Sequence, residues 1–221
     1  MLWTLPQGLI DKLFPRHVTQ LLPRRSVIFT QGSPADVLYW VKKGIVELYR
    51  TGRNGKPLLA RLVGPTEIIG FAEIDDQGEA GEMFEARARL NCELVMITRE
   101  HIVKVLHGLD ADALAGLIAL LNKSWSEQAL YWASLVLMDC RERLSHVLID
   151  LARRFGTQDK RGTLIVLDLT HQDFAAMVGF SRALTSRMIG ELLNDGLLIF
   201  EQGHYLLPHR SELAVAAKLA S

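Results

Sequence analysis

The pattern of residues between Thr170 and Arg187 constrains the fold of this chain more than any other segment. Thr170 precedes an apolar run as a helix N-cap would, and Asp173 follows three residues later in a form of the capping box. Gly179 can adopt the left-handed conformation that ends a helix sharply, because it lacks a Cβ. Ser181 is then placed to cap a second helix. The segment is predicted to form two short helices joined by a tight turn.

The second of these helices, predicted over residues 181–193, has an apolar inner face and a basic outer face. The inner face carries Leu184, Met188, Ile189, Leu192 and Leu193, and the outer face carries Arg182, Ala183, Ser186 and Arg187. Between Phe174 and Gly190 there are two arginines and no acid, so the outer face is locally positive. Such a helix fits the DNA major groove, where arginine pairs bidentately with guanine. The alternative is an ordinary helical hairpin with solvated arginines.

Two strand patterns follow the predicted helix pair. The run Asn194-Asp195-Gly196 ends the second helix, and residues 197–200 and 204–207 are predicted strands around Gln202-Gly203. A β-hairpin in this position makes a winged helix, whose wing lies over the phosphate backbone. The hairpin favours DNA binding over the ordinary helical hairpin.

The overall composition does not itself indicate a nucleic-acid partner. Lysine plus arginine and aspartate plus glutamate number 25 each among 221 residues, and from Asp139 onward there are ten of each sign. DNA affinity must therefore come from local placement of charge. Cys92 and Cys140 match no disulfide or metal pattern, which suits a reducing cytoplasm. Without a signal sequence or a long apolar run, neither secretion nor a membrane location is expected.

The first half of the chain has the pattern of an all-β unit. Short β-type segments separated by turn signals occupy residues 27–29, 37–41, 45–50, 58–63, 84–90 and 93–98. This spacing predicts a β-sandwich or barrel. In the fifth segment Phe84, Ala86, Ala88 and Leu90 alternate with charged residues, so one face of that strand is expected to be buried.

A long helix is predicted over residues 110–138. Its apolar positions repeat at spacings of 4 and 3, with one polar member, at Leu114, Ile118, Leu121, Trp125, Gln128, Trp132 and Leu135. A helix on the surface of its own domain usually carries a wider and less regular stripe, so a parallel homodimeric coiled coil is favoured over packing on the chain's own core.

Asp139 and Glu142 predict the start of a further helix, whose apolar face runs to Phe155-Gly156. A polar loop over residues 157–162 and a strand over residues 164–167 are predicted to connect this helix to Thr170. The boundary at residues 137–139 is the expected hinge.

The order of β-roll, long helix and winged helix resembles the Crp/Fnr family of bacterial transcription regulators over essentially the whole chain. The resemblance is carried by residues 29–32, 35–36, 38–39, 43–44, 48–50, 64, 69–70, 169–187 and 191–198. It implies an α+β fold with a cyclic-nucleotide-binding-like β-roll that senses an effector over residues 1–109, a dimerisation helix over 110–138, and a winged-helix DNA-binding domain over 139–221. It also implies a cytoplasmic homodimer whose partners are double-stranded DNA and RNA polymerase.

The resemblance assigns base reading to Arg182 and Arg187, and phosphate contacts to Thr170, His171, Gln172 and Ser181. One departure lies in this segment, since Ala183 stands where the family usually has glutamate. An acceptor for the cytosine N4 amino group is therefore missing, and the half-site read by other members cannot be carried over.

A second departure concerns the effector. Members that bind cyclic nucleotides carry glycine-glutamate and arginine-serine pairs, but here Phe71 follows Gly70, and Glu82-Met83 stands near the arginine-serine position. An anionic phosphate would meet an acid in place of its bidentate partner, so cyclic AMP or GMP is not expected.

No cofactor is expected either. The N-terminal cysteine cluster of iron-sulfur members is absent. Haem would need an axial ligand such as His17, His101 or His107, and lone histidines are more often surface or capping residues.

The remaining candidate effector pocket lies between the β-roll and the long helix, near Phe71, Arg87, Arg89, Gln128 and Trp132. Family members that bind small carboxylates use arginine in this region, so Arg87 is a candidate anion ligand. The favoured alternative is that Arg87 and Arg89 lie on a solvated strand face. A third possibility is a regulator that is active without a small ligand.

Two other classes of function remain as alternatives. A cupin-like enzyme needs two or three histidines and a carboxylate around a metal, yet no histidine lies between Val27 and Thr98, so neither an enzyme nor a metal site is expected. The second alternative is an interaction protein that keeps the fold but has lost DNA binding. Ala183 and the neutral C-terminal segment point to it.

Overall fold

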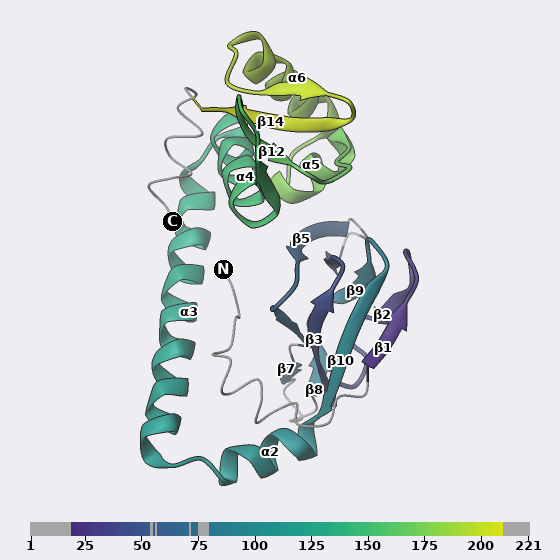
Figure 1. Cartoon of the computed structure of the whole chain (residues 1–221), viewed down its shortest axis with the longest axis vertical. Helices are drawn as coiled ribbons and strands as arrows, with labels where there is room; N and C mark the ends of the chain where they lie inside the picture. The colour runs from purple at the N-terminus through teal and green to yellow at the C-terminus, as the bar shows by residue number, and fades with distance from the viewer. Residues whose placement is uncertain (1–18, 54, 56, 71, 75–79, 210–221) are drawn as a thin grey trace. The chain divides into compact units, whose positions relative to one another are not determined.

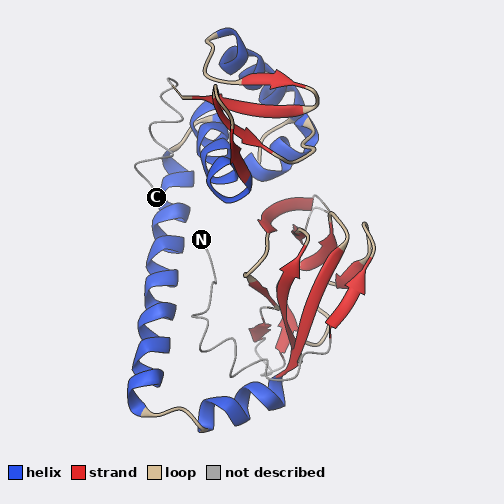
Figure 2. Cartoon of the chain, in the orientation of Figure 1, coloured by secondary structure: helices blue, strands red, loops and turns tan. Residues whose placement is uncertain are grey.

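The structure is a computed structural model that describes residues 19–53, 55, 57–70, 72–74 and 80–209 (Figure 1, Figure 2). Within the long helix, the side chains of residues 120, 123–124, 127–128 and 130–136 are outside the description, as are those of residues 72–74 and 80. Contacts divide the chain into two compact units, Met1–Ala133 and Ser134–Ser221. No helix in the described part has the length and apolar character needed to cross a membrane.

The first unit is a β-roll of antiparallel sheets followed by helices. Its elements are β1 (Thr19–Leu22), β2 (Val27–Phe29), β3 (Val37–Lys43), β4 (Val46–Thr51), β5 (Pro57–Val63), β6 (Ile68–Ile69), β7 (Ala72–Ile74), β8 (Ala80–Glu82), β9 (Glu85–Ala88), β10 (Cys92–Thr98), α2 (Arg99–His107) and most of α3 (Ala111–Leu137), whose last residues, from Ser134, fall in the second unit. One sheet has the order β1-β10-β3-β6 and another has the order β2-β9-β4-β5. The predicted all-β unit is confirmed.

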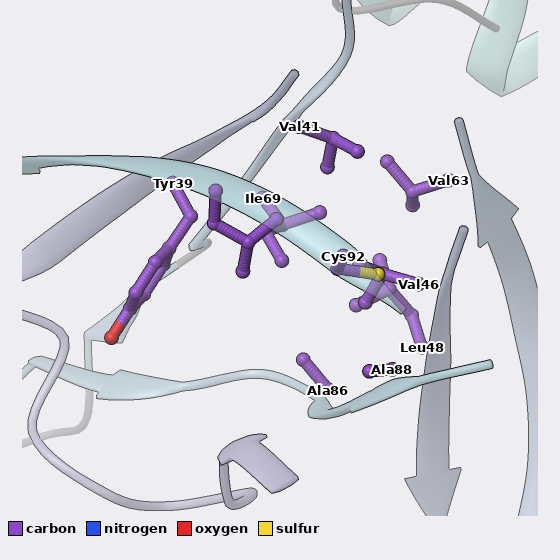
Figure 3. Packing of buried hydrophobic residues seen from close by; sticks show 10 residues of the cluster. Tyr39, Val41, Val46, Leu48, Val63, Ile69, Ala86, Ala88 and Cys92 are labelled. Carbon is purple, nitrogen blue, oxygen red and sulfur yellow. The ribbon is translucent and has the colours of Figure 1, made fainter. Parts of the chain in front are cut away.

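The core of the β-roll contains apolar side chains from both four-stranded sheets (Figure 3). Val41, Leu94 and Ile69 come from the first sheet, and Val46 and Leu48 from the second, all nearly or fully buried. The predicted alternation holds for Ala86 and Ala88, which are buried, but it is wrong for Leu90, which is 41 % exposed. Because β9 ends at Ala88, the alternation no longer places Leu90 over the core.

The sequence pattern did not predict β1, β6, β7, β8 or α2. Each of these strands has two to four residues, too few for a recognisable alternation. α2 packs Ile102 and Val105 against Val95 and Ile97 on the face of β10 that points away from the main core. The long helix α3 begins and ends within one residue of its predicted limits.

The second unit packs three helices on a small antiparallel sheet. Its elements are α4 (Cys140–Phe155), β11 (Gly156–Gln158), β12 (Gly162–Ile165), α5 (His171–Val178), α6 (Arg182–Asn194), β13 (Ile199–Glu201) and β14 (His204–Pro208), with the strand order β11-β12-β14-β13. Asp139 caps α4 in a full capping box with Glu142, as predicted. The predicted loop over residues 157–162 is wrong at its start, because Gly156–Gln158 pairs with β12 as a strand. β12 itself begins two residues before the predicted strand.

Gly44 provides a test of the β-roll core. Its φ is +92°, and a Cβ atom there would lie 2.4 Å from the carbonyl oxygen of Asn91 and 2.8 Å from the Cα of Cys92. We expect Gly44→Ala to lower the free energy of unfolding by about 2–4 kcal/mol, since backbone strain and a backbone clash add. Urea unfolding followed by tryptophan fluorescence measures the loss.

The matched control is Gly32→Ala, because Gly32 has a similar φ of +81° with nothing within 4 Å of the added Cβ. This variant carries the left-handed strain without the clash and should lose only about 1 kcal/mol. Equal losses in the two variants would contradict the assignment of the larger cost to the contact with residues 91 and 92.

Candidate nucleic-acid interface

Local sequence signals place α5 and α6 as a helix-turn-helix. Thr170 and Asp173 form both arms of a capping box at the start of α5. Gly179 ends α5 in the left-handed conformation, with a φ of +75°. The Ser181 hydroxyl then accepts a hydrogen bond of 3.3 Å from the backbone N–H of Leu184 and caps α6. The predicted helix pair and its turn are confirmed at each of these positions.

Apolar packing holds α6 in a fixed rotation about its axis. Phe174 of α5 is fully buried and meets the ring of Tyr205 in β14 edge to face, with 5.2 Å between ring centroids. Met188, Ile189 and Leu192 bury the inner side of α6. Leu184 and Leu193, also predicted on this side, are only partly buried.

A buried polar residue on α6 was missed by the sequence pattern. Thr185 has no exposed surface, and its hydroxyl donates a hydrogen bond of 3.0 Å to the carbonyl oxygen of Ser181. A threonine hydroxyl can satisfy itself within its own helix in this way, so the methyl group can pack in the core.

The opposite face of α6 points into solvent. Arg182, Ala183 and Arg187 are exposed, and Ser186 is half-buried. The Arg187 side chain is 69 % exposed, and its Nε lies 3.8 Å from a carboxylate oxygen of Glu191. These are the residues predicted to face DNA, and the structure places them together on one helix face.

The residues predicted to touch phosphates lie at the starts of α5 and α6. Thr170, Gln172 and Ser181 are exposed. The Thr170 hydroxyl lies 2.9 Å from an Asp173 carboxylate oxygen. His171 is half-buried, and its Nδ1 lies 2.9 Å from the hydroxyl oxygen of Ser186 on α6.

Ion pairs explain how a neutral domain can still present a positive helix face. Arg141 pairs with Asp195, Arg154 with Asp150, and Arg161 with Glu201. Arg182, in contrast, has no carboxylate within 4 Å among the described residues. The positive electrostatic potential at the outer face of α6 is therefore larger than the net charge of the domain suggests.

β13 and β14 form the predicted wing. Their register pairs Glu201 with His204 across a turn in which Gln202 and Gly203 both have positive φ. The pairing of β14 with β12 and the Arg161–Glu201 ion pair anchor this hairpin to the rest of the sheet. The predicted β-hairpin is confirmed, although its first strand begins at Ile199, two residues after the predicted start.

Arg143 of α4 supports the end of α5. Its Nη1 donates a hydrogen bond of 3.2 Å to the carbonyl oxygen of Val178, and its Nε donates one of 3.3 Å to that of Met138. The guanidinium also lies over the ring of Phe180, 4.9 Å from its centroid. The side chain thus satisfies a carbonyl that the last turn of α5 leaves open.

The arginines of the candidate effector pocket already have carboxylate partners. Arg87 is exposed and pairs with Glu85 on the same strand. Arg89 is largely buried and pairs with Glu47 at 2.5 Å, so it does not lie on a solvated face. The remaining predicted members, Phe71 and the side chains of Gln128 and Trp132, lie outside the described residues.

The predicted dimer seam is exposed wherever the structure describes it. Leu114, Ile118 and Leu121 are each more than a third exposed, and Trp125 is 75 % exposed. Gln128, Trp132 and Leu135 belong to the part of α3 whose side chains are not described. An apolar row of this kind is characteristic of an interface.

Two helices across a tight turn, an arginine-bearing outer face and a β-hairpin wing define a winged-helix DNA-binding domain. Sequence comparisons agree: residues 142–216 match a model of the Crp-like helix-turn-helix domain, and residues 19–109 match a cyclic nucleotide-binding domain. The cyclic AMP receptor protein of Thermus thermophilus is 30% identical over 189 residues, covering 86% of this chain and 83% of that protein. The chain belongs to the Crp/Fnr family and is a DNA-binding transcription regulator.

Two further relatives support this assignment. A CRP-like cAMP-activated global transcriptional regulator of Mycobacterium tuberculosis is 28% identical over 208 residues, covering 89% of this chain and 86% of that protein. The solved structure of the c-di-GMP responsive global regulator CLP of Xanthomonas campestris has a TM-score of 0.72 at 25% identity, covering 92% of this chain and 99% of that chain.

The support that Arg143 gives to α5 leads to a prediction. We expect Arg143→Met to lower the free energy of unfolding by about 1–3 kcal/mol, because two carbonyls lose a charged donor. The control, Lys160→Met, removes the same charge from an exposed position in the same unit and should change stability by less than about 0.5 kcal/mol. Thermal unfolding of both full-length variants tests this, and equal shifts in Tm would show that the carbonyl contacts contribute nothing.

Proposed function

We propose that the protein acts as a homodimer that reads an inverted repeat, with α6 of each copy in the major groove. The observation that carries this proposal is the outer face of α6, where Arg182, Ala183 and Arg187 are exposed and Ser186 is half-buried, on a helix whose other side is buried. The exposed apolar row on α3 supports pairing with a second copy, which would leave two α6 helices related by a two-fold axis. Such dimers place their recognition helices about 34 Å apart, one turn of B-DNA.

Within this complex, we assign base reading to Arg182 and Arg187, which are exposed on the side of α6 opposite its buried residues. We assign contacts with the phosphate backbone to the polar residues at the N-terminal ends of α5 and α6, which are Thr170, His171, Gln172 and Ser181. Ala183 offers no acceptor to cytosine, so the operator should differ from those of family members with glutamate there.

Selection of bound duplexes from a random pool, combined with the mass of the protein in solution, tests the proposal. The expected result is an enriched two-fold-symmetric site together with a dimeric mass. A monomeric protein, or a pool without symmetry after selection, would refute it. Strong retention on non-specific DNA at low salt separates this proposal from an interaction protein that has lost DNA binding.

Arg182 gives the sharpest mutational test of base reading. We expect Arg182→Ala to cost about 1–3 kcal/mol, or about 5- to 150-fold in affinity, and to relax discrimination at one base pair of each half-site. Competition binding with every single-base variant of the selected site measures both effects. Arg99→Ala, which removes an exposed arginine at the start of α2, is the control and should leave affinity and selectivity unchanged. An equal loss on all duplexes would instead assign Arg182 to a phosphate.

For the β-roll, we propose an effector other than a cyclic nucleotide, or none. The relatives from T. thermophilus and M. tuberculosis are named for cyclic AMP. In this chain Glu82 stands near the sequence position that the phosphate-binding arginine occupies in other family members, and its side chain is buried. Burial raises the pKa of the Tyr39 hydroxyl, and the negative charge of Glu82 raises it further. A cyclic phosphate brought near this carboxylate would meet repulsion in a low dielectric.

Accordingly, cyclic AMP, cyclic GMP or c-di-GMP at millimolar concentration should leave the affinity for the selected duplex unchanged within about twofold, since a phosphate beside the buried carboxylate would place like charges together in a low dielectric. Fluorescence anisotropy of a labelled duplex measures this, with the cyclic AMP receptor protein of T. thermophilus as the positive control. A tenfold or greater change with any of the three would contradict the proposal.

We also propose that no resident cofactor is present and that the protein is not an enzyme. Iron-sulfur clusters of the common types need about four thiolates, and the chain has only two cysteines, both buried. The relatives are transcription regulators, which supports RNA polymerase as a further partner and the cytoplasm as the place of action.

A further inference from the structure

A side-chain hydrogen bond joins the start of α5 to the middle of α6 in the helix-turn-helix. The Nδ1 atom of His171, the first residue of α5, lies 2.9 Å from the hydroxyl oxygen of Ser186 in the middle of α6. Both residues are half-buried. The residues before and after His171 in the chain, Thr170 and Gln172, are exposed. The imidazole is thus held at the edge of the surface that carries Arg182 and Arg187.

This bond is not needed to hold the helices together. α5 and α6 already pack against each other and are connected by the turn at Gly179, and both helices carry fully buried apolar residues, such as Phe174 and Ile189. A half-buried hydrogen bond of this kind adds little stability when the partners can also bond to water. Its main effect is to fix the orientation of one ring.

The chemistry of imidazole determines what this orientation does. When the Ser186 hydroxyl donates to Nδ1, the ring proton is on Nε2, so Nε2–H becomes a donor on the other side of the ring. When the imidazole is protonated, Ser186 accepts from Nδ1–H and Nε2–H is again a donor. The neutral form with its proton on Nδ1 can also donate to the Ser186 oxygen, but it presents a bare Nε2 lone pair, which a phosphate oxygen would repel, so a nearby phosphate selects the forms that carry a proton on Nε2.

We propose that Ser186 is a positioning residue for DNA binding, which orients His171 so that its Nε2–H donates to a backbone phosphate. The proposal rests on the docking of α6 in the major groove described above. It also assigns a role to Ser186 itself, because a hydroxyl engaged with His171 is not available to a base edge. The base pair opposite Ser186, between those read by Arg182 and Arg187, is then bound with little selectivity.

The proposal is tested on the full-length dimer with the selected duplex. Imidazole nitrogen shifts of His171, measured by ¹⁵N NMR in the wild type, Ser186→Ala and Ser186→Thr, report which ring nitrogen carries the proton. The exposed His209 serves as an internal reference. We expect His171 to hold its proton on Nε2 in the wild type and in Ser186→Thr, and to become a mixture of tautomers in Ser186→Ala.

Binding measurements form the second arm. We expect His171→Ala and Ser186→Ala each to lose about 3- to 10-fold in affinity on every duplex, with Ser186→Thr restoring it. Duplexes with a neutral methylphosphonate at one backbone position at a time locate the contact. At one position per half-site the modification should weaken the wild type and leave Ser186→Ala and His171→Ala nearly unaffected. Equal unfolding temperatures show that the variants are folded.

Three results would overturn the proposal. Unchanged His171 nitrogen shifts in Ser186→Ala would show that the serine does not set the tautomer. A change of selectivity at one base pair in Ser186→Ala would show that the hydroxyl reads a base. The absence of any methylphosphonate position that removes the difference between the wild type and the variants would deny a phosphate partner. If Arg182→Ala still relaxes selectivity while any of these is found, the groove docking stands and only the role of Ser186 fails.

Discussion

The burial of one side of α6 is the constraint on which the rest of the DNA-binding unit depends. Met188, Ile189 and Leu192 are buried on this helix, which packs against α4 and α5, and Phe174 of α5 in turn meets the ring of Tyr205. Because an α-helix has a fixed angle per residue, locking one face determines which residues the other face presents. The exposed arginines are consequences of this packing, and so is the approach of Ser186 to His171.

The surface potential of this chain depends on which charged side chains form ion pairs, and not on the total number of charges of each sign. Most of the arginines described in the second unit are neutralised by nearby carboxylates, as Arg141, Arg154 and Arg161 are. The same rule disfavours the candidate anion site of the β-roll, where Arg87 and Arg89 have glutamate partners. A surface charge that already has a partner must lose it before it can bind a ligand. Arg182, which has no carboxylate within 4 Å among the described residues, is therefore a stronger indicator of a binding surface than Arg187, whose Nε lies 3.8 Å from Glu191.

Much of the fold could be predicted because local signals and the hydrophobic pattern agree. The capping boxes at Asp139 and Thr170, the left-handed Gly179 and the turn at Gln202-Gly203 each act within a few residues, and each lies where the sequence predicts it. The errors have a common cause. β11, β1 and α2 are short and are stabilised by a neighbouring strand or sheet, and Leu90 is exposed because its strand ends early. The hydrophobic periodicity of a segment carries no information about such long-range partners.

The sequence by itself determined the class of the protein and the residues on the exposed face of α6, since these depend on caps, turns and the 3.6-residue period. Only the tertiary structure decided which polar groups are already engaged. The ion pair of Arg89 with Glu47, the buried hydroxyl of Thr185 and the bond between His171 and Ser186 are examples. Two of these join residues far apart in the chain, and no local rule encodes such a meeting, because it arises when separate elements pack against each other. The third depends on burial of its side chain, which packing also decides.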